Sequence, residues 1–439
     1  MGKPNLKSLS PMDFTKMTPT RNEKIEAAST SDIPKLSTYK ANVLAKRLHP
    51  QAQHLIVEQV IEHNSNMKSY VMTFDSEAGT NELAWFSAGQ YLSITLEIGN
   101  HKLTRPYSIS SSPKDSTNGK YMITIKRVGG GLASEFILDN WAVGTKVVAS
   151  APLGQFTYEP LRDGKTIIGV AGGSGITPFR SLAYAIADGD EDASLVLLYG
   201  SKTLEEAVFS DEISKLASTC DRIKLINVLS DEQSAEPSAE PSAGCEKGFI
   251  TADLIKKYAP SSDYSIFICG PQAMYKFVDS EIATLGIASK YVRHELFGEY
   301  FNPSNDAQYV APVSETVSIT VRQAGIESTI SASINTSILR SIEASGILCP
   351  ARCRSGECGW CHSKLVSGDV YIPKSVDGRR EADIKFGYIH PCCTFPLSDI
   401  VIEVPPVAAT APAAPAAPAV PAEPEASAAP AEPEAPAAQ

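Results

Sequence analysis

The sequence predicts a multidomain protein with an antiparallel β-barrel, an α/β domain built on a parallel sheet, and a small α+β domain. Two changes of pattern along the chain indicate this division. From Tyr39 to about residue 160, short strands separated by turn residues are typical of an antiparallel barrel. Buried strands that alternate with helical stretches then extend to about residue 301. Alternating strands and one helix return after residue 312.

The individual elements follow from runs of β-branched and aromatic residues. In the barrel we expect strands at residues 57–60, 70–74, 91–96 and 121–125. In the α/β domain, residues 167–171 form an expected buried strand that a Gly-rich turn and a helix over 179–187 follow. Further buried strands are expected at 195–199, 223–228 and 265–269, and the last domain has an expected helix at 338–344.

Composition sets the boundaries between these parts. Residues 1–38 are polar and form an expected flexible N-terminal arm, and residues 405–439 form an expected disordered tail of Ala, Pro and Glu. The barrel is assigned to 39–160, the α/β domain to 161–301, a linker to 302–312 and the small domain to 313–404. The Ser-Ala-Glu-Pro repeat at 234–244 is an expected exposed loop within the α/β domain.

Charge and cysteine content narrow the functional classes. The net charge of −11 over 439 residues argues against a general nucleic-acid binder. No apolar run is long enough for a transmembrane helix, and the first thirty residues lack the apolar core of a secretory signal. Nine unevenly spaced cysteines fit a protein of the reducing cytoplasm.

Three cysteines in one short loop carry the strongest motif. Cys353, Cys358 and Cys361 have the C-x₄-C-x₂-C spacing of a plant-type [2Fe–2S] cluster, and Cys392 supplies the fourth ligand. Gly356 allows the backbone to curl around the cluster, as does Gly359. A structural zinc is the main rival, although adjacent cysteines at 392 and 393 do not give its usual spacing. Both Cys393 and Cys349 are expected to be buried, non-ligating thiols.

A second motif lies in the expected barrel. The run from Arg105 to Ser111 has the form R-x-Y-S-x-x-S, in which an arginine pairs with a phosphate, an aromatic ring covers a flavin and a hydroxyl bonds a flavin nitrogen. A strand edge with a surface arginine explains the run equally well. The turn of Gly129 to Gly131, followed by Ser134, opens a helix and suits a pyrophosphate.

Two turns of the α/β domain indicate a nucleotide site. The run 172–178 reads Gly-Gly-Ser-Gly-Ile-Thr-Pro after a buried strand, with Thr177 and Pro178 as the expected N-cap and first residue of a helix. Cys269, Gly270 and Pro271 end a later strand of the same sheet. Because ligands of open α/β sheets bind at the carboxyl ends of strands, both turns can face one nucleotide.

These motifs, in this order, resemble the ferredoxin–NADP reductase superfamily. The carboxy-terminal position of the cysteine loop is similar to the oxygenase-reductase branch, the phthalate dioxygenase reductase-like proteins. The resemblance covers residues 50–404 and implies an FAD-binding barrel, an NAD(P)-binding domain and a β-grasp ferredoxin domain. It implies that Arg105, Pro106, Tyr107, Ser108, Lys126, Val128, Gly131 and Ser134 contact FAD. It also implies that Gly173, Ser174, Gly175, Thr177, Cys269, Gly270 and Pro271 contact NADH or NADPH, and that Phe297 covers the second flavin face.

The resemblance implies an NAD(P)H:acceptor oxidoreductase. Electrons would pass from NAD(P)H through FAD and the [2Fe–2S] cluster to a separate protein, such as an oxygenase or another metalloenzyme, without nucleic acid or membrane insertion. Tyr107, Ser108 and Cys269 would line the reacting flavin and nicotinamide. Two alternatives stay open, an electron-transfer subunit of a stable larger complex and a flavin/iron–sulfur redox sensor. Simple core packing remains an alternative for Phe297, and a surface position is expected for His390.

Overall fold

The computed structural model describes residues 21–26, 39–231, 245–295 and 303–406. Residues 1–51 and 52–439 are separate units, and each is described by itself. In the first unit, residues 21–26 are helical and helix α2 (Lys40–Leu48) has no buried residue. The repeat at 234–244, Phe297 and the tail from 407 lie outside the described residues. Within the described ranges, no helix is long and apolar enough to cross a membrane.

The first domain of the second unit is a curled antiparallel sheet, as expected. Six strands have the order β4-β3-β6-β1-β2-β5, and a bridge between Ile109 and Ile123 joins the two ends of this order. Alternate side chains of the strands fill the interior of this sheet. Among them are the buried Leu55, Tyr70 and Ile94. The strands are β1 (Gln53–Asn64), β2 (Met67–Phe74), β3 (Tyr91–Ile98), β4 (His101–Ser108), β5 (Tyr121–Lys126) and β6 (Lys146–Ala149), with helices α3 (Pro113–Thr117) and α4 (Leu132–Asn140) between them.

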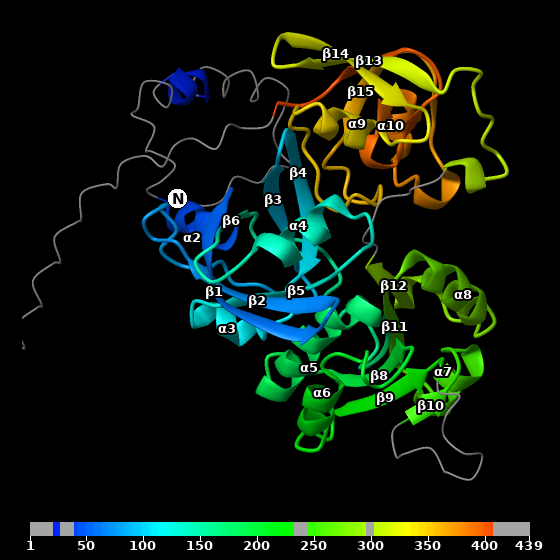
Figure 1. Ribbon diagram of the computed structural model, residues 1–439. Helices are drawn as coiled ribbons and strands as arrows, with labels where there is room; N and C mark the ends of the chain where they lie inside the picture. Colours follow the sequence, from blue (N-terminus) through cyan, green and yellow to red (C-terminus); the bar gives the residue numbers. More distant parts are fainter. Residues whose placement is uncertain (1–20, 27–38, 232–244, 296–302, 407–439) are drawn as a thin grey trace, which may run out of the picture. The chain divides into compact units, whose positions relative to one another are not determined.

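The second domain is a parallel sheet with helices on both faces (Figure 1). Its strand order is β10-β9-β8-β7-β11-β12, so β7 lies between two strands that are distant in sequence. Helices α5 and α6 pack on one face, and α7 and α8 pack on the other. The elements are β7 (Thr166–Gly172), α5 (Thr177–Asp188), β8 (Ser194–Ser201), α6 (Ser210–Ala217), β9 (Ile223–Leu229), β10 (Cys245–Lys247), α7 (Ala252–Tyr258), β11 (Tyr264–Cys269), α8 (Gln272–Ala283) and β12 (Val292–Glu295).

The third domain has a five-stranded mixed sheet with the order β14-β13-β19-β15-β17. Helix α9 (Ile338–Ala344) occupies the residues that the sequence predicts, and the Ser337 side chain caps it by accepting from the Arg340 N–H. Ile338, Leu339 and Ile342 of this helix are buried in the domain core. The strands are β13 (Thr316–Gln323), β14 (Ile326–Ser333), β15 (Ser363–Ser367), β17 (Tyr388–Ile389) and β19 (Ile400–Glu403), with α10 (Glu381–Lys385) and a small pair of β16 (Val370–Tyr371) and β18 (Phe395–Pro396).

Candidate functional site

The four predicted cluster cysteines form two pairs. Cys361 Sγ lies 3.4 Å from Cys392 Sγ, and the thiols of Cys353 and Cys358 are hydrogen-bonded to one another. Hydrogen bonding from Cys358 lowers the pKa of Cys353, and hydrogen bonding from Cys361 lowers the pKa of Cys392. One thiol of each pair therefore favours the thiolate, which is the ligating form.

This pairing fits two irons better than one zinc. A structural zinc requires four ligands around a single ion. The two irons of a [2Fe–2S] cluster instead share four cysteine thiolates, two on each iron. The backbone N–H of Cys358 lies 3.4 Å from Cys353 Sγ, and the Trp360 N–H lies 3.4 Å from Cys358 Sγ. Such N–H groups stabilise the negative charge on the sulfurs of an iron–sulfur cluster.

Gly356 is required by its surroundings. Its φ is +87°, and a Cβ at this position would lie 2.1 Å from the Val376 carbonyl oxygen. Only glycine fits both the left-handed backbone and the close approach of the neighbouring chain. The cysteine loop can therefore curl as the sequence predicts.

His390 does not lie at the surface, contrary to expectation. Its side chain is buried, and Nδ1 lies 2.7 Å from the Gly356 carbonyl oxygen. The imidazole therefore supports the backbone of the cysteine loop, a contact between residues that are far apart in sequence. Cys349 and Cys393 are buried, and their role as non-ligating thiols stays a prediction.

The two predicted nucleotide turns lie side by side at the switch point of the parallel sheet. β7 pairs with β8 on one side and with β11 on the other, so the chain leaves β7 where the strand order reverses. Gly173–Ile176 (η3) follows β7, and Cys269 ends β11. Crevices at such switch points are the usual ligand sites of open α/β sheets.

One detail of the first turn differs from expectation. Ile176 is the N-cap of α5, and Thr177 is its first residue rather than its cap. The Thr177 hydroxyl donates to the Ser174 carbonyl oxygen at 3.0 Å. The short helix η3 before α5 supplies this carbonyl, and no side chain caps α5.

A glycine brings these two turns into contact. A Cβ on Gly175 would lie 2.0 Å from the Cys269 carbonyl oxygen and 2.7 Å from the Gly270 nitrogen. The turn after β7 therefore rests directly on the end of β11. Lys126, from the barrel, reaches the same place, because its Nζ would lie 3.4 Å from a Cβ on Gly173.

The predicted flavin residues lie on β4 and at the start of α4. Arg105, Pro106, Tyr107 and Ser108 end β4, and Gly131 is the N-cap of α4. The Ser134 hydroxyl oxygen accepts from the Val128 N–H at 3.1 Å and holds the turn before the helix. The N–H groups at this helix start can bind a phosphate, which fits a flavin nucleotide.

Glu295 is a site residue that the sequence reasoning did not find. It ends β12, where its Oε2 accepts from the Ser108 hydroxyl at 3.1 Å and lies 3.8 Å from Cys269 Sγ. Its Oε1 is buried and has no hydrogen-bond partner among the described residues. Burial raises the pKa of this carboxyl well above its ordinary value and so favours the protonated form. An acidic residue at the carboxyl end of a strand was the only signal in the sequence.

One cavity connects these residues. It has a volume of about 960 Å³, and the flavin run, both nucleotide turns and Glu295 line it together with residues of the third domain. Its lining includes Arg105, Pro106, Tyr107, Ser108, Lys126, Val128, Gly131, Ser134, Gly173, Ser174, Gly175, Thr177, Cys269, Gly270 and Pro271. This is a volume suited to organic cofactors.

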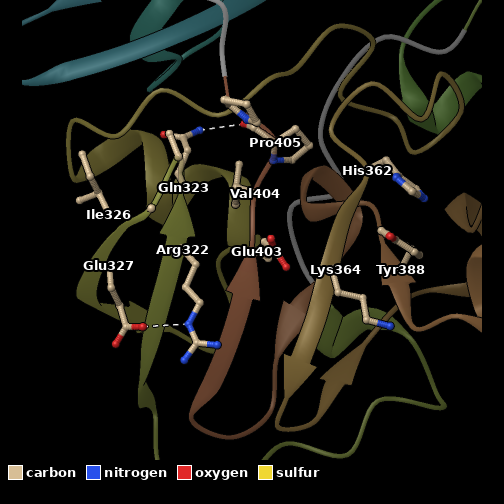
Figure 2. Close-up of a pocket in the computed structure, with 13 residues that line it drawn as sticks. Arg322, Gln323, Ile326, Glu327, His362, Lys364, Tyr388, Glu403, Val404 and Pro405 are labelled. Atoms are coloured by element: carbon tan, nitrogen blue, oxygen red, sulfur yellow. Dashed lines mark hydrogen bonds and ion pairs between the residues drawn. The ribbon is translucent and has the colours of Figure 1, made fainter.

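A second pocket of about 700 Å³ contains none of the predicted site residues (Figure 2). It lies in the third domain between the β13–β14 hairpin and the chain from Glu403 to Pro406. Arg322 and Glu327 form an ion pair of 2.8 Å beside it, and the Gln323 amide donates to the Pro405 carbonyl oxygen at 3.0 Å. The ion pair lies within the hairpin, and the Gln323 contact fixes the hairpin to the chain after β19.

Other polar residues have structural roles. His294 Nε2 lies 2.7 Å from Asp279 at the surface, and Glu212 accepts from Arg180 and Tyr184. Arg180 also donates to the Ser110 carbonyl oxygen, which joins the α/β domain to the barrel.

Comparison with protein-family models divides the chain in the same order. Residues 55–158 match the oxidoreductase FAD-binding domain, 170–280 the oxidoreductase NAD-binding domain, and 321–397 the 2Fe-2S iron-sulfur cluster binding domain.

Curated relatives cover most of the chain. The glycine betaine monooxygenase reductase subunit of Pseudomonas aeruginosa is 26% identical over 84% of this chain and 100% of its own length. The NADH oxidoreductase HCR of Escherichia coli is 25% identical over 72% of this chain and 88% of its own. Among solved structures, phthalate dioxygenase reductase has a similar fold, with a TM-score of 0.56 and 23% identity over 80% of this chain and 98% of that one.

Proposed function

Because the chain is an oxidoreductase of the ferredoxin–NADP reductase superfamily with FAD-binding, NAD-binding and 2Fe–2S domains, we propose that it is the reductase component of an oxygenase system. It would carry electrons from NADH through FAD and the cluster to a separate oxygenase protein. The observation that carries this proposal is the single cavity lined by the flavin run, both nucleotide turns and residues of the ferredoxin domain.

The residues around the cavity divide into two groups. Arg105, Tyr107, Ser108, Lys126, Val128, Gly131 and Ser134 would hold FAD, with Pro106 shaping the strand between them. Gly173 to Gly175, Thr177 and Cys269 to Pro271 would hold NADH. Phe297 lies outside the described residues, so its place against the flavin stays a prediction. When bound, FAD accepts a hydride and the cluster accepts single electrons.

The protein's own residues orient the reactants and hold a proton. Ser108 is fixed by its hydrogen bond to Glu295 Oε2, and Cys269 borders the same carboxyl. Because Oε2 already accepts from Ser108, a proton on Glu295 would lie at Oε1, whose partner would be a ligand in the cavity. Tyr275 supports this arrangement by donating to the Glu295 carbonyl oxygen at 2.5 Å and accepting from the Gly270 N–H at 3.1 Å.

The cysteine loop offers both an entry and an exit for electrons. The Thr104 hydroxyl of the barrel donates at 2.8 Å to the carbonyl oxygen of Ala351, two residues before Cys353. The loop thus lies close to the flavin domain. Cys358 is also exposed, and the Trp360 ring beside it is 50% exposed with Arg352 stacked 3.3 Å from its centroid. A protein acceptor can therefore approach the cluster at this edge.

A second candidate follows from the Escherichia coli relative, which is named an NADH oxidoreductase rather than a subunit of an oxygenase. The acceptor would then be another metalloenzyme, with the same electron path inside this chain. We place the protein in the cytoplasm, where thiols stay reduced, because nine free cysteines are spread along the chain.

Anaerobic stopped-flow absorbance with NADH, and separately with NADPH, tests the proposal. We expect flavin bleaching followed by cluster reduction. The nucleotide that bleaches the flavin faster is the electron donor. In Cys358→Ser, flavin bleaching should persist while electron output to a one-electron protein acceptor is lost. Cys220→Ser, away from the loop, is the matched control. A protein loaded with FAD that neither nucleotide bleaches would exclude the reductase function.

A further inference from the structure

Arg354 occupies an unusual position in the cysteine loop. It follows the cluster ligand Cys353 directly, its side chain is 1% exposed, and its φ is +62°. A left-handed backbone is disfavoured for a residue with a long side chain. Fully buried arginines are also rare unless they are paired. Both features indicate that neighbouring residues hold the Arg354 side chain in one defined position.

The partner of Arg354 is Glu343 on helix α9. Two guanidinium nitrogens donate to the two carboxylate oxygens, each at 2.7 Å. The Glu343 side chain is 4% exposed, so both charges are removed from water. A buried ion pair of this kind contributes little net stability compared with an apolar pair. Its geometry is nevertheless highly specific, because the planar guanidinium matches the carboxylate in one orientation.

This ion pair reaches from the ferredoxin domain into the flavin domain. Arg354 Nη1 lies 3.2 Å from the Thr104 carbonyl oxygen on β4, and the Thr104 hydroxyl donates to the Ala351 carbonyl oxygen at 2.8 Å. Arg105 Nη1 lies 3.7 Å from Glu343 Oε2. Glu343 is therefore shared between the arginine of the cluster loop and the arginine of the flavin run.

The strand that receives these contacts is the end strand of its sheet. β4 pairs with β3 on one edge, and the bridge from Ile109 to Ile123 meets β5 beyond the end of β4, so Thr104 can contact the third domain. An arginine has five N–H donors, so Arg105 can retain Glu343 while it also faces a phosphate in the cavity. Charged contacts thus lead from Arg105, which lines the cavity, through Glu343 to Arg354, the residue that follows Cys353 in the chain.

We propose that Arg354 and Glu343 are positioning residues for electron transfer, and that their shared ion pair fixes the cluster loop against the strand carrying the flavin run. This inference rests on the proposed reductase function. In this step one electron passes from the reduced flavin to the oxidised cluster, NADH is the source of electrons, and no bond to a protein atom forms or breaks. Small displacements of reacting groups have large effects on rates.

The test separates the two electron-transfer steps in the full-length, cofactor-loaded protein. In the double variant Arg354→Met with Glu343→Leu, an apolar pair replaces the two-pronged ion pair, while Arg105 loses Glu343 and keeps its hydrogen bond to the Thr104 carbonyl oxygen. Flavin bleaching by NADH should stay within about twofold of the wild-type rate, while cluster reduction should slow by about tenfold or more. Arg354→Lys keeps the charge but loses the two-pronged contact, and should slow cluster reduction by an intermediate factor.

Two further measurements do not depend on turnover. Iron content and the electron paramagnetic resonance spectrum after dithionite reduction should match those of the wild type. Backbone hydrogen exchange over residues 103–108 and 350–354 should become faster in the double variant. The matched control replaces the exposed pair Arg322 and Glu327 by Gln, and should change neither rate.

A wild-type rate of cluster reduction in the double variant, with the cluster intact, would overturn the inference. If the double variant does not take up its cluster, the variant Thr104→Val provides the test of the inference. This change removes only the hydrogen bond to the Ala351 carbonyl oxygen. Cluster reduction slowed by about twofold or more supports the inference, and an unchanged rate overturns it. Absence of flavin bleaching in the wild type would instead contradict the proposed function, while hydrogen exchange would still report on the ion pair.

Discussion

Replacing Gly175 by Ala would separate the two nucleotide turns. The added Cβ would lie 2.0 Å from the Cys269 carbonyl oxygen and 2.4 Å from its carbonyl carbon. Since Cβ atoms essentially never approach other atoms within 3.0 Å, the turn after β7 and the end of β11 must move apart by about 1 Å. Both contacts are with backbone atoms, so no side chain can rotate to relieve them.

A displacement of about 1 Å between groups that bind one substrate can reduce a rate by about 100-fold. We therefore expect Gly175→Ala to slow flavin reduction by NADH by about this factor. Overpacking should also lower the stability of the domain by about 1–3 kcal/mol. The assay is anaerobic stopped-flow flavin bleaching over a range of NADH concentrations, with thermal unfolding followed in parallel.

Gly200→Ala is the matched control, because it adds the same methyl group to the neighbouring strand β8. Its Cβ would meet the Ala171 carbonyl oxygen at 3.4 Å, which is an ordinary contact. This variant should reduce its flavin within about threefold of the wild-type rate. If Gly175→Ala bleached as fast as the control, with an unchanged dependence on NADH, close contact between the turns would not matter for nucleotide binding.

Three further outcomes are expected. Ser108→Ala removes the hydroxyl that donates to Glu295 and should slow flavin reduction by about 10–100-fold with FAD still bound; a wild-type rate in stopped flow would contradict a role for this hydroxyl. Glu295→Gln should gain stability over the wild type as the pH rises above 4.5, because the unfolded carboxyl then ionises while burial keeps the folded one protonated. A difference in urea midpoints that did not grow between pH 5 and pH 7.5 would refute this. Asp163→Ala should destabilise the protein by about 3–5 kcal/mol, since it leaves Arg293, whose side chain is 9% exposed, without its carboxylate partner. Chemical denaturation measures the loss, and a change below about 1 kcal/mol would show that the pair is dispensable.

Local patterns in the sequence were sufficient for the architecture. The β-branched runs of the barrel and the buried strands of the parallel sheet predicted the elements that the structure has, although β1 is longer than expected. Helix α9 lies where the sequence predicts a helix, and the structure shows Ser337 as its N-cap and Gly346 just after its end. Strands β4 and β6 of the barrel, and strands β10 and β12 of the parallel sheet, were not predicted. β4 contains Pro106 and several polar residues, and β6 has only four residues.

The contacts that complete the site are long-range and have no local signal. Glu295 reaches Ser108 from another domain, and Glu343 meets Arg354 and Arg105 from a helix whose periodicity predicts only a core face. His390 is buried against Gly356 because a distant loop covers it. Each of these side chains is polar, and its burial depends on a partner that only the folded chain supplies.

The position of β7 between β8 and β11 also affects how the protein acquires its nucleotide site during folding. Thr166 pairs with Tyr264, so the two strands that carry the site are about a hundred residues apart along the chain. During synthesis β7 can pair with β8, and β8 with β9, but the other edge of β7 stays open until β11 has emerged. The apolar residues at this edge are then exposed to association with other chains. Capacity to bind NADH should therefore appear late and in a single step, and it would be a sensitive measure of complete folding.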